Sequence, residues 1–147
     1  MRKFIAGADE QGSSRLVESG SVELVADPNS PGFLSAVIAE TLSTPPPSRP
    51  AGKAPTSDLG VAPGFARWFI VDYEADLVFP MHNTDTVDFD IVLDGSVTLG
   101  LDDGEHVLDA GDILVINGVD HSWRAGSKGC RLSVLMIGTP PLEQRPI

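Results

Sequence analysis

The side chains in this sequence that could carry acid–base or metal chemistry near neutral pH gather in two short stretches. The first stretch is 81–92, where an imidazole, a hydroxyl and two carboxyl groups occupy positions of equal parity. These residues are His82, Thr84, Asp88 and Asp90. Side chains of equal parity lie on one face of an extended strand, so we expect the four to point the same way and to line a cavity.

The second stretch is centred on His121. His121 can lie beside the first row only if the intervening strands curl back on themselves, as strands do in a small barrel. Trp123 shares the parity of His121, and together with Phe79 it is expected to contact a substrate. Packing in the core is the alternative for both aromatic side chains. His106 follows an acidic turn and is expected at the surface.

The two carboxyl groups of the row impose an electrostatic condition on the cavity. If Asp88 and Asp90 share one cavity, they repel each other, and the pKa of one is raised unless a cation lies between them. Either a metal ion neutralises the pair, or one carboxyl group carries a proton and can act as an acid or a base. A third possibility is that a β-bulge turns Asp90 toward solvent.

The elements that would position these residues are short β-strands. The chain has 147 residues, of which 41% are hydrophobic, 15 are Gly and 12 are Pro. This is enough for one domain and too little for two independent cores. From residue 65 onward, short β-favouring runs alternate with turn signals such as Asp94-Gly95 and Asn117-Gly118. This spacing predicts an all-β fold of antiparallel hairpins, in a sandwich or a barrel.

The chain divides into four expected segments. Residues 1–42 are expected to form two or three strands that pack on the barrel. For residues 35–42 the sequence fits either a strand or a short helix. Residues 43–64 hold six of the prolines and few large apolar side chains, which predicts a loop or a mobile arm. Residues 65–138 are expected to form the barrel, and 139–147 an irregular tail.

Charge, hydropathy and cysteine content limit the partners, the location and the kinds of site that we expect for this protein. The formal net charge of −11 would repel a phosphate backbone or an anionic lipid surface, so neither nucleic acid nor membrane is expected as a partner. No apolar stretch has the length of a membrane span or of a signal peptide, which favours a soluble, cytoplasmic protein. Cys130 is the single cysteine, so an intrachain disulfide and a cysteine-based zinc site are excluded.

The stretch that begins at Met81 resembles the first conserved motif of the cupin superfamily. His82 matches the first histidine of that motif, and Gly95 matches its last glycine. Thr84 stands where the family has a second histidine, and Asp88 stands where it has a glutamate. The second cupin motif is matched by four residues, with Asn117 near its proline position. They are Gly111, Asp112, Gly118 and His121.

The resemblance covers about residues 66–138 and implies a double-stranded β-helix, the cupin barrel, with any metal inside it. Its ligand set would be His82, Asp88 and His121, two imidazoles and one carboxylate, which suits iron, zinc, manganese or nickel. The threonine at position 84 removes one imidazole, so a metal-free polar pocket stays an equal alternative. No organic cofactor is expected.

The resemblance implies a small-molecule enzyme: a decarboxylase, an isomerase or dehydratase, or a dioxygenase. In that enzyme Thr84 would orient a bound water or a substrate oxygen, and Asp90 would be a general base. The alternative is a non-catalytic, ligand-binding cupin that has lost its metal site. Family analogy further implies a homodimer, in which residues 1–25 add to the sheet of the neighbouring copy.

Overall fold

The computed structural model describes residues 1–142, and its regular elements are all β-strands. Residues 143–147, most of the expected irregular tail, lie outside the described part. None of the described segments forms a helix that could cross a membrane. The expected all-β fold is confirmed. The strands are β1 (Arg2–Ala8), β2 (Ser14–Ser21), β3 (Val25–Ala26), β4 (Leu34–Ser35), β5 (Ala66–Tyr73), β6 (Val78–His82), β7 (Thr86–Leu101), β8 (Gly104–Asp109), β9 (Ile113–Ile116) and β10 (His121–Gly138).

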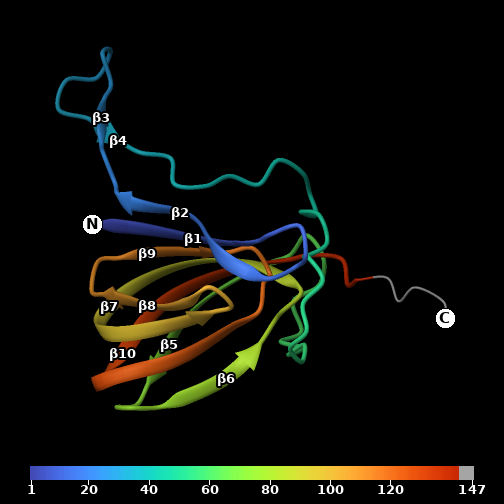
Figure 1. Cartoon of the computed structure of the whole chain (residues 1–147). Helices are drawn as coiled ribbons and strands as arrows, with labels where there is room; N and C mark the ends of the chain where they lie inside the picture. The colour runs from blue at the N-terminus through green and yellow to red at the C-terminus, as the bar shows by residue number, and fades with distance from the viewer. Residues whose placement is uncertain (143–147) are drawn as a thin grey trace.

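Two long strands, β7 and β10, organise the barrel (Figure 1). They pair antiparallel with each other along almost their whole lengths. The first half of β7 also pairs with β9 and its second half with β8. The first half of β10 pairs with β6 and its second half with β5. Each long strand therefore passes from one half of the barrel to the other, which is the arrangement of a double-stranded β-helix.

The hydrophobic core is formed by buried side chains of β1, β7, β8, β9 and β10. Val97, Leu99 and Leu101 alternate along β7 with polar residues and glycine, and all three are buried. They pack with Leu108 of β8 and Leu132 of β10. Full burial of one such side chain stabilises the fold by about 1.5–3 kcal/mol. This core holds β7 and β10 in fixed register, so the polar residues near their ends have defined positions.

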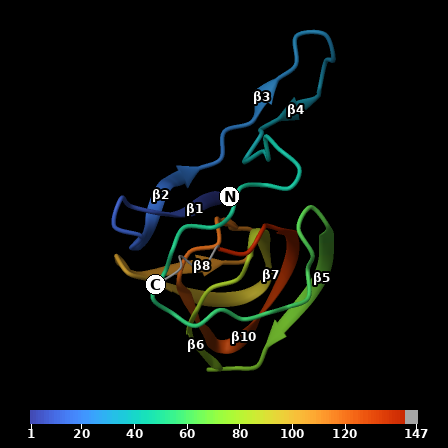
Figure 2. The same cartoon turned by 90° about the vertical axis from the view of Figure 1, so that its right-hand side faces the viewer.

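The N-terminal residues divide into a part that joins the barrel and a part that does not. β1 pairs parallel with β9 and antiparallel with β2, so residues 2–21 extend the main sheet. β3 and β4 pair only with each other and project from the barrel as a hairpin in both views (Figures 1 and 2). The expectation that all of 1–42 packs on the barrel therefore differs from the structure. Residues 36–42 have no regular structure.

The proline-rich segment is an ordered connection, which we call the strap (residues 49–64). It crosses the end of the barrel that faces the viewer in Figure 2. Two isolated β-bridges, Thr56 with Asn83 and Pro63 with Gly138, join it to the barrel. As expected it forms no strand, but hydrogen bonds to buried polar side chains hold it in place, so it is not a free arm.

Candidate functional site

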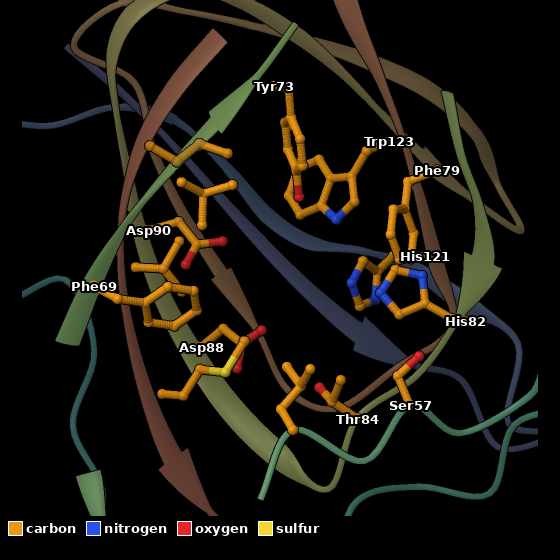
Figure 3. A pocket seen from close by; sticks show the side chains of 15 residues that line it. Ser57, Phe69, Tyr73, Phe79, His82, Thr84, Asp88, Asp90, His121 and Trp123 are labelled. Carbon is orange, nitrogen blue, oxygen red and sulfur yellow. The ribbon is translucent and has the colours of Figure 1, made fainter. Parts of the chain in front are cut away.

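A cavity of about 210 Å³ lies inside the barrel, beneath the strap (Figure 3). Every residue that the sequence nominated for the site lines it, from β6, β7, β10 and the segment between β6 and β7. These residues are Phe79, His82, Thr84, Asp88, Asp90, His121 and Trp123. The residues at positions 82, 84, 88 and 90, which have equal parity, thus all line the same cavity.

The two histidines form one side of this space, which we call the histidine wall. His82 and His121 are paired residues of β6 and β10, and their ring centroids are 4.3 Å apart. Nδ1 of His82 lies 2.9 Å from the carbonyl oxygen of Pro80, and Nδ1 of His121 lies 2.8 Å from that of Val119. A carbonyl oxygen only accepts, so each Nδ1 is the protonated donor. In the neutral rings, Nε2 then carries the lone pair.

Electrostatics keeps the His121 ring neutral. Burial of its side chain, together with the nearby His82, lowers the pKa of the imidazole to about 4, and the hydrogen bond to Val119 and the charge of Asp120 oppose this shift only in part. At neutral pH the Nε2 atom of His121 is therefore a free base. A neutral imidazole with Nδ1 fixed by a carbonyl is suited either to accept a proton or to bind a metal.

The two aspartates form the carboxylate wall. Asp88 and Asp90 alternate on β7 and are 4% and 2% exposed, so the alternative in which Asp90 turns to solvent is not what the structure contains. Burial raises the pKa of Asp88 to about 7. Burial and the charge of Asp88 raise the pKa of Asp90 well above its ordinary range. At neutral pH the pair therefore holds a proton.

Hydrogen bonding distinguishes the two carboxyl groups. Thr84 Oγ1 and Thr86 Oγ1 are 2.7 Å apart, and Thr86 Oγ1 donates to Asp88 Oδ1 at 2.6 Å. A chain of two hydroxyl groups thus runs from the cavity to Asp88. By contrast, the buried Oδ1 atom of Asp90 has no hydrogen-bond partner within residues 1–142. Such an atom is costly unless a proton or a ligand satisfies it.

The remaining surface of the cavity is apolar and largely aromatic. Trp123 contacts His121 edge to face, with ring centroids 5.5 Å apart, and Phe79 contacts His82 in the same manner at 4.7 Å. Tyr73 lies beside Trp123, with centroids 6.2 Å apart. Other apolar side chains complete the lining. They are Leu59, Phe69, Val71, Leu132, Val134 and Met136.

The ligand set expected for a metal is not assembled. Among residues 1–142, no group of three or more His, Cys, Asp or Glu side chains is placed to hold a metal ion. The structure brings His82 and His121 together, but Asp88 lies across the cavity from them (Figure 3). His106, expected at the surface, is partly exposed and lies 2.7 Å from Asp103.

Sequence reasoning missed the residues that hold the strap over the cavity. Asn83 follows His82, Asp120 precedes His121, and both are buried. Asn83 Nδ2 donates to Asp120 Oδ1 at 2.7 Å and to the carbonyl oxygen of Ala54 at 3.0 Å. The strap in turn contributes Ser57 and Leu59 to the cavity lining. The signal available in the sequence was the position of two polar residues directly beside the two histidines.

Comparisons with known proteins give partial matches. No protein-family model matches the chain. It is 36% identical over 84 residues to phomopsin biosynthesis cluster protein C' of Diaporthe leptostromiformis, a match over 55% of this chain and 44% of the relative. It is 39% identical over 86 residues to oryzines biosynthesis cluster protein J of Aspergillus oryzae, over 58% of this chain and 46% of the relative. The chain spans less than half the length of these curated relatives.

Solved structures similar to the chain include a cupin-2 domain protein from Shewanella frigidimarina. The match has a TM-score of 0.42 and 26% identity, over 48% of this chain and 68% of that one. The cupin domain of Cnp3 from Schizosaccharomyces pombe matches with a TM-score of 0.46 and 13% identity, over 88% and 77% of the two chains. Cupins are among its structural neighbours. The cupin fold itself rests on the pairing of β7 and β10 described above.

Proposed function

We propose that the chain is a cupin-fold enzyme that moves a proton within a small organic molecule, as an isomerase or a dehydratase does. The observation that carries the proposal is the opposition of two kinds of group across one small cavity. The lone pair of the neutral His121 imidazole lies on one side, and a proton-bearing pair of carboxyl groups lies on the other. Separate acid and base groups of this kind are what a proton shift requires.

The proposed step uses one group from each wall. Nε2 of His121 takes a proton from a carbon of the substrate, and the carboxyl group of Asp88 gives a proton to another atom of the same molecule. In an isomerisation the composition of the substrate is unchanged. In a dehydration the protonated hydroxyl group leaves as water. The imidazolium and the Asp88 carboxylate then return to their starting states by exchanging a proton through solvent.

The other polar residues of the cavity support this step. Thr86 donates to Asp88 Oδ1 and thereby orients the carboxyl group, while Thr84 extends that chain toward the substrate. Asp90, expected from the sequence to be a general base, is here the neighbouring buried carboxyl group that shares the proton of the pair. The relatives are named as biosynthesis cluster proteins, which supports a role in making a small molecule.

The metal implied by the cupin resemblance does not fit the residues present, because only two imidazoles converge and the carboxylates lie across the cavity. The proposed step therefore uses no metal. Elemental analysis of protein purified without a polyhistidine tag tests this. A stoichiometric transition metal that is lost in His82→Ala would refute the metal-free step and return the site to the metal-dependent alternatives.

Solvent deuterium tests the proposed chemistry even while the substrate is unidentified. The protein is incubated in D₂O with a library of small hydroxy, oxo and amino compounds, and mass spectrometry detects deuterium incorporation. We expect incorporation with the wild-type chain and a rate at least about 100-fold lower in Asp88→Asn, since a general acid typically contributes that much. His106→Gln, outside the cavity, is the matched control and should behave as wild type.

A non-catalytic binding protein is the second candidate, favoured by the unpartnered Oδ1 atom of Asp90. It predicts that a compound of the library binds in the cavity and acquires no deuterium. Equal deuterium incorporation in the wild type and in Asp88→Asn would contradict the enzymatic proposal, as would its absence from every compound that binds.

A further inference from the structure

We propose that the cavity selects small organic cations of the primary amine class, with the ammonium group held by Asp90. This inference rests on the proposed function only in that the same cavity receives the substrate. It adds the charge and the orientation of the ligand, which neither the sequence nor the comparisons assign.

The first observation is the state of the Asp90 side chain. It is 2% exposed, and its Oδ1 atom has no hydrogen-bond partner in the described part of the chain, although the neighbouring Asp88 is bonded to Thr86. Figure 3 shows the Asp90 carboxyl group directed into the cavity. Buried carboxylate oxygens are normally hydrogen-bonded, and the donor missing here can be supplied by a ligand N–H group.

The second observation is that no basic side chain compensates the carboxylate wall. No Lys or Arg is found among the described residues that line the cavity. Between Trp68 and Trp123 the sequence contains thirteen acidic residues and no Lys or Arg. Arg67 donates to the carbonyl oxygen of Leu59, and Arg124 pairs with Glu105 in an exposed contact. The charges around the cavity thus attract a cation and repel a carboxylate or a phosphate.

The third observation is the aromatic surface that the ligand would meet. Tyr73 and Trp123 lie side by side at one end of the cavity (Figure 3). Burial raises the pKa of Tyr73, and the charge of Asp90 raises it further. An ammonium group is attracted to aromatic ring faces, most strongly when it is shielded from water. The apolar body of the ligand would pack against Leu132 and Met136, which also line the cavity.

These contacts define an orientation in which the ammonium end lies at Asp90 and the reacting end faces the histidine wall. The bound ammonium ion would stabilise the ionised form of Asp90, and the proton shared by the two carboxyl groups would then lie on Asp88. The strap covers part of this space and contributes Ser57 and Leu59 to the lining that the ligand would meet.

The test compares three compounds of similar size, which are benzylammonium chloride, benzyl alcohol and sodium benzoate. Titration calorimetry at pH 7 and constant ionic strength measures their affinities for the full chain. We expect benzylammonium to bind at least tenfold more tightly than benzyl alcohol, and benzoate not to bind. Equal or tighter binding of the alcohol or the benzoate would overturn the proposal, and so would the failure of all three compounds to bind.

Two variants test whether Asp90 is the residue responsible for the preference for benzylammonium. Asp90→Asn is expected to weaken benzylammonium binding at least tenfold and to leave benzyl alcohol binding within about twofold. Glu74→Gln removes the same charge from an exposed position and should change neither affinity. Unchanged benzylammonium binding in Asp90→Asn overturns the proposal. If thermal unfolding shows that Asp90→Asn does not fold, the preference of the wild-type protein among the three compounds decides.

The outcome is separable from that of the proposed function. Benzylammonium binding with no deuterium transfer to any compound would keep the cation site and refute the enzymatic proposal. Asp88-dependent deuterium transfer to neutral compounds alone, without benzylammonium binding, would keep the enzyme and refute the ligand class.

Discussion

Replacement of Asp120 by alanine should release the strap from the barrel. The buried Asp120 carboxylate accepts three hydrogen bonds, from Asn83 Nδ2 at 2.7 Å, from the Lys53 amide at 2.8 Å and from the Ala54 amide at 3.1 Å. At about 1 kcal/mol or more for each bond to a charged acceptor, Asp120→Ala should lower the free energy of unfolding by about 2–4 kcal/mol. Urea unfolding measures this loss.

The pH dependence of the loss follows from the Asp120 pKa. Burial would raise that pKa, but the hydrogen bonds from Asn83 and from the two strap amides outweigh burial and lower it below its ordinary value of 3.8. A lowered pKa means that Asp120 contributes stability above pH 3.8, and that this contribution is lost as the pH falls through the folded-state pKa. The difference between wild type and Asp120→Ala should therefore be full at pH 7 and become smaller in strong acid.

Two local measurements show whether the strap itself is released. Hydrogen exchange of the Lys53 and Ala54 amides should accelerate in Asp120→Ala. In a Trp68→Phe background, Trp123 is the only tryptophan, and its fluorescence should become more accessible to the neutral quencher acrylamide. Asp109→Ala, which removes an exposed carboxylate, is the control. Stability within about 0.5 kcal/mol of wild type, with unchanged amide exchange, would refute the reasoning.

Two further predictions concern the carboxylate wall and the oligomeric state. Burial raises the Asp88 pKa to about 7, so its contribution to stability is full below pH 3.8 and is lost as the pH rises through 7. From pH 5 to pH 8 the wild type should lose about 2–3 kcal/mol more than Asp88→Asn in urea unfolding, and parallel curves would refute this. A homodimer is the second prediction, because Trp68 and Ile70 are 75% and 56% exposed on the outer face of β5. Light scattering should give a dimeric mass that Trp68→Lys reduces, and a monomeric wild type would contradict it.

The strands and the inward row could be predicted because they depend on local pattern. Alternation along β7 assigns Leu99 to the core, and the parity of 82, 84, 88 and 90 assigns one face to the polar row. Of the turn signals named after residue 65, Asn117-Gly118 does lie between two strands, β9 and β10. The turn expected at Asp94-Gly95 is wrong, because β7 continues through these two residues as one long strand. These features involve neighbours in the chain, where stereochemistry alone decides which way a side chain points.

Distances within the cavity could not be predicted in the same way. Parity places Asp88 and His82 on one face of a segment, but it does not determine how far apart they lie once that segment bends into the barrel. The structure places Asp88 beside Asp90 and His82 beside His121. The three-residue metal set required convergence across strands, which depends on the pairing of β6, β7 and β10.

The strap illustrates a different reason why the sequence was insufficient. Its composition correctly indicated the absence of a strand, since prolines interrupt it and few large apolar side chains are present. Composition could not indicate that Asn83 and Asp120, far along the chain, would satisfy its backbone groups. Hydrogen bonds between residues so far apart in the chain cannot be predicted from local sequence patterns.

The attachment of the strap has a consequence for how such a site could diversify. Asn83 and Asp120, the two buried residues that hold the strap, are each next to a cavity histidine in the sequence. Ser57 and Leu59 of the strap line the cavity, and neither is hydrogen-bonded to the side chain of Asn83 or Asp120. Substitutions at positions 57 and 59 can therefore change the shape of the cavity lining beneath the strap and leave the histidine wall and the carboxylate wall unchanged. Exchanging this short stretch between homologous chains offers a direct way to alter which molecules are accepted while the reaction stays the same.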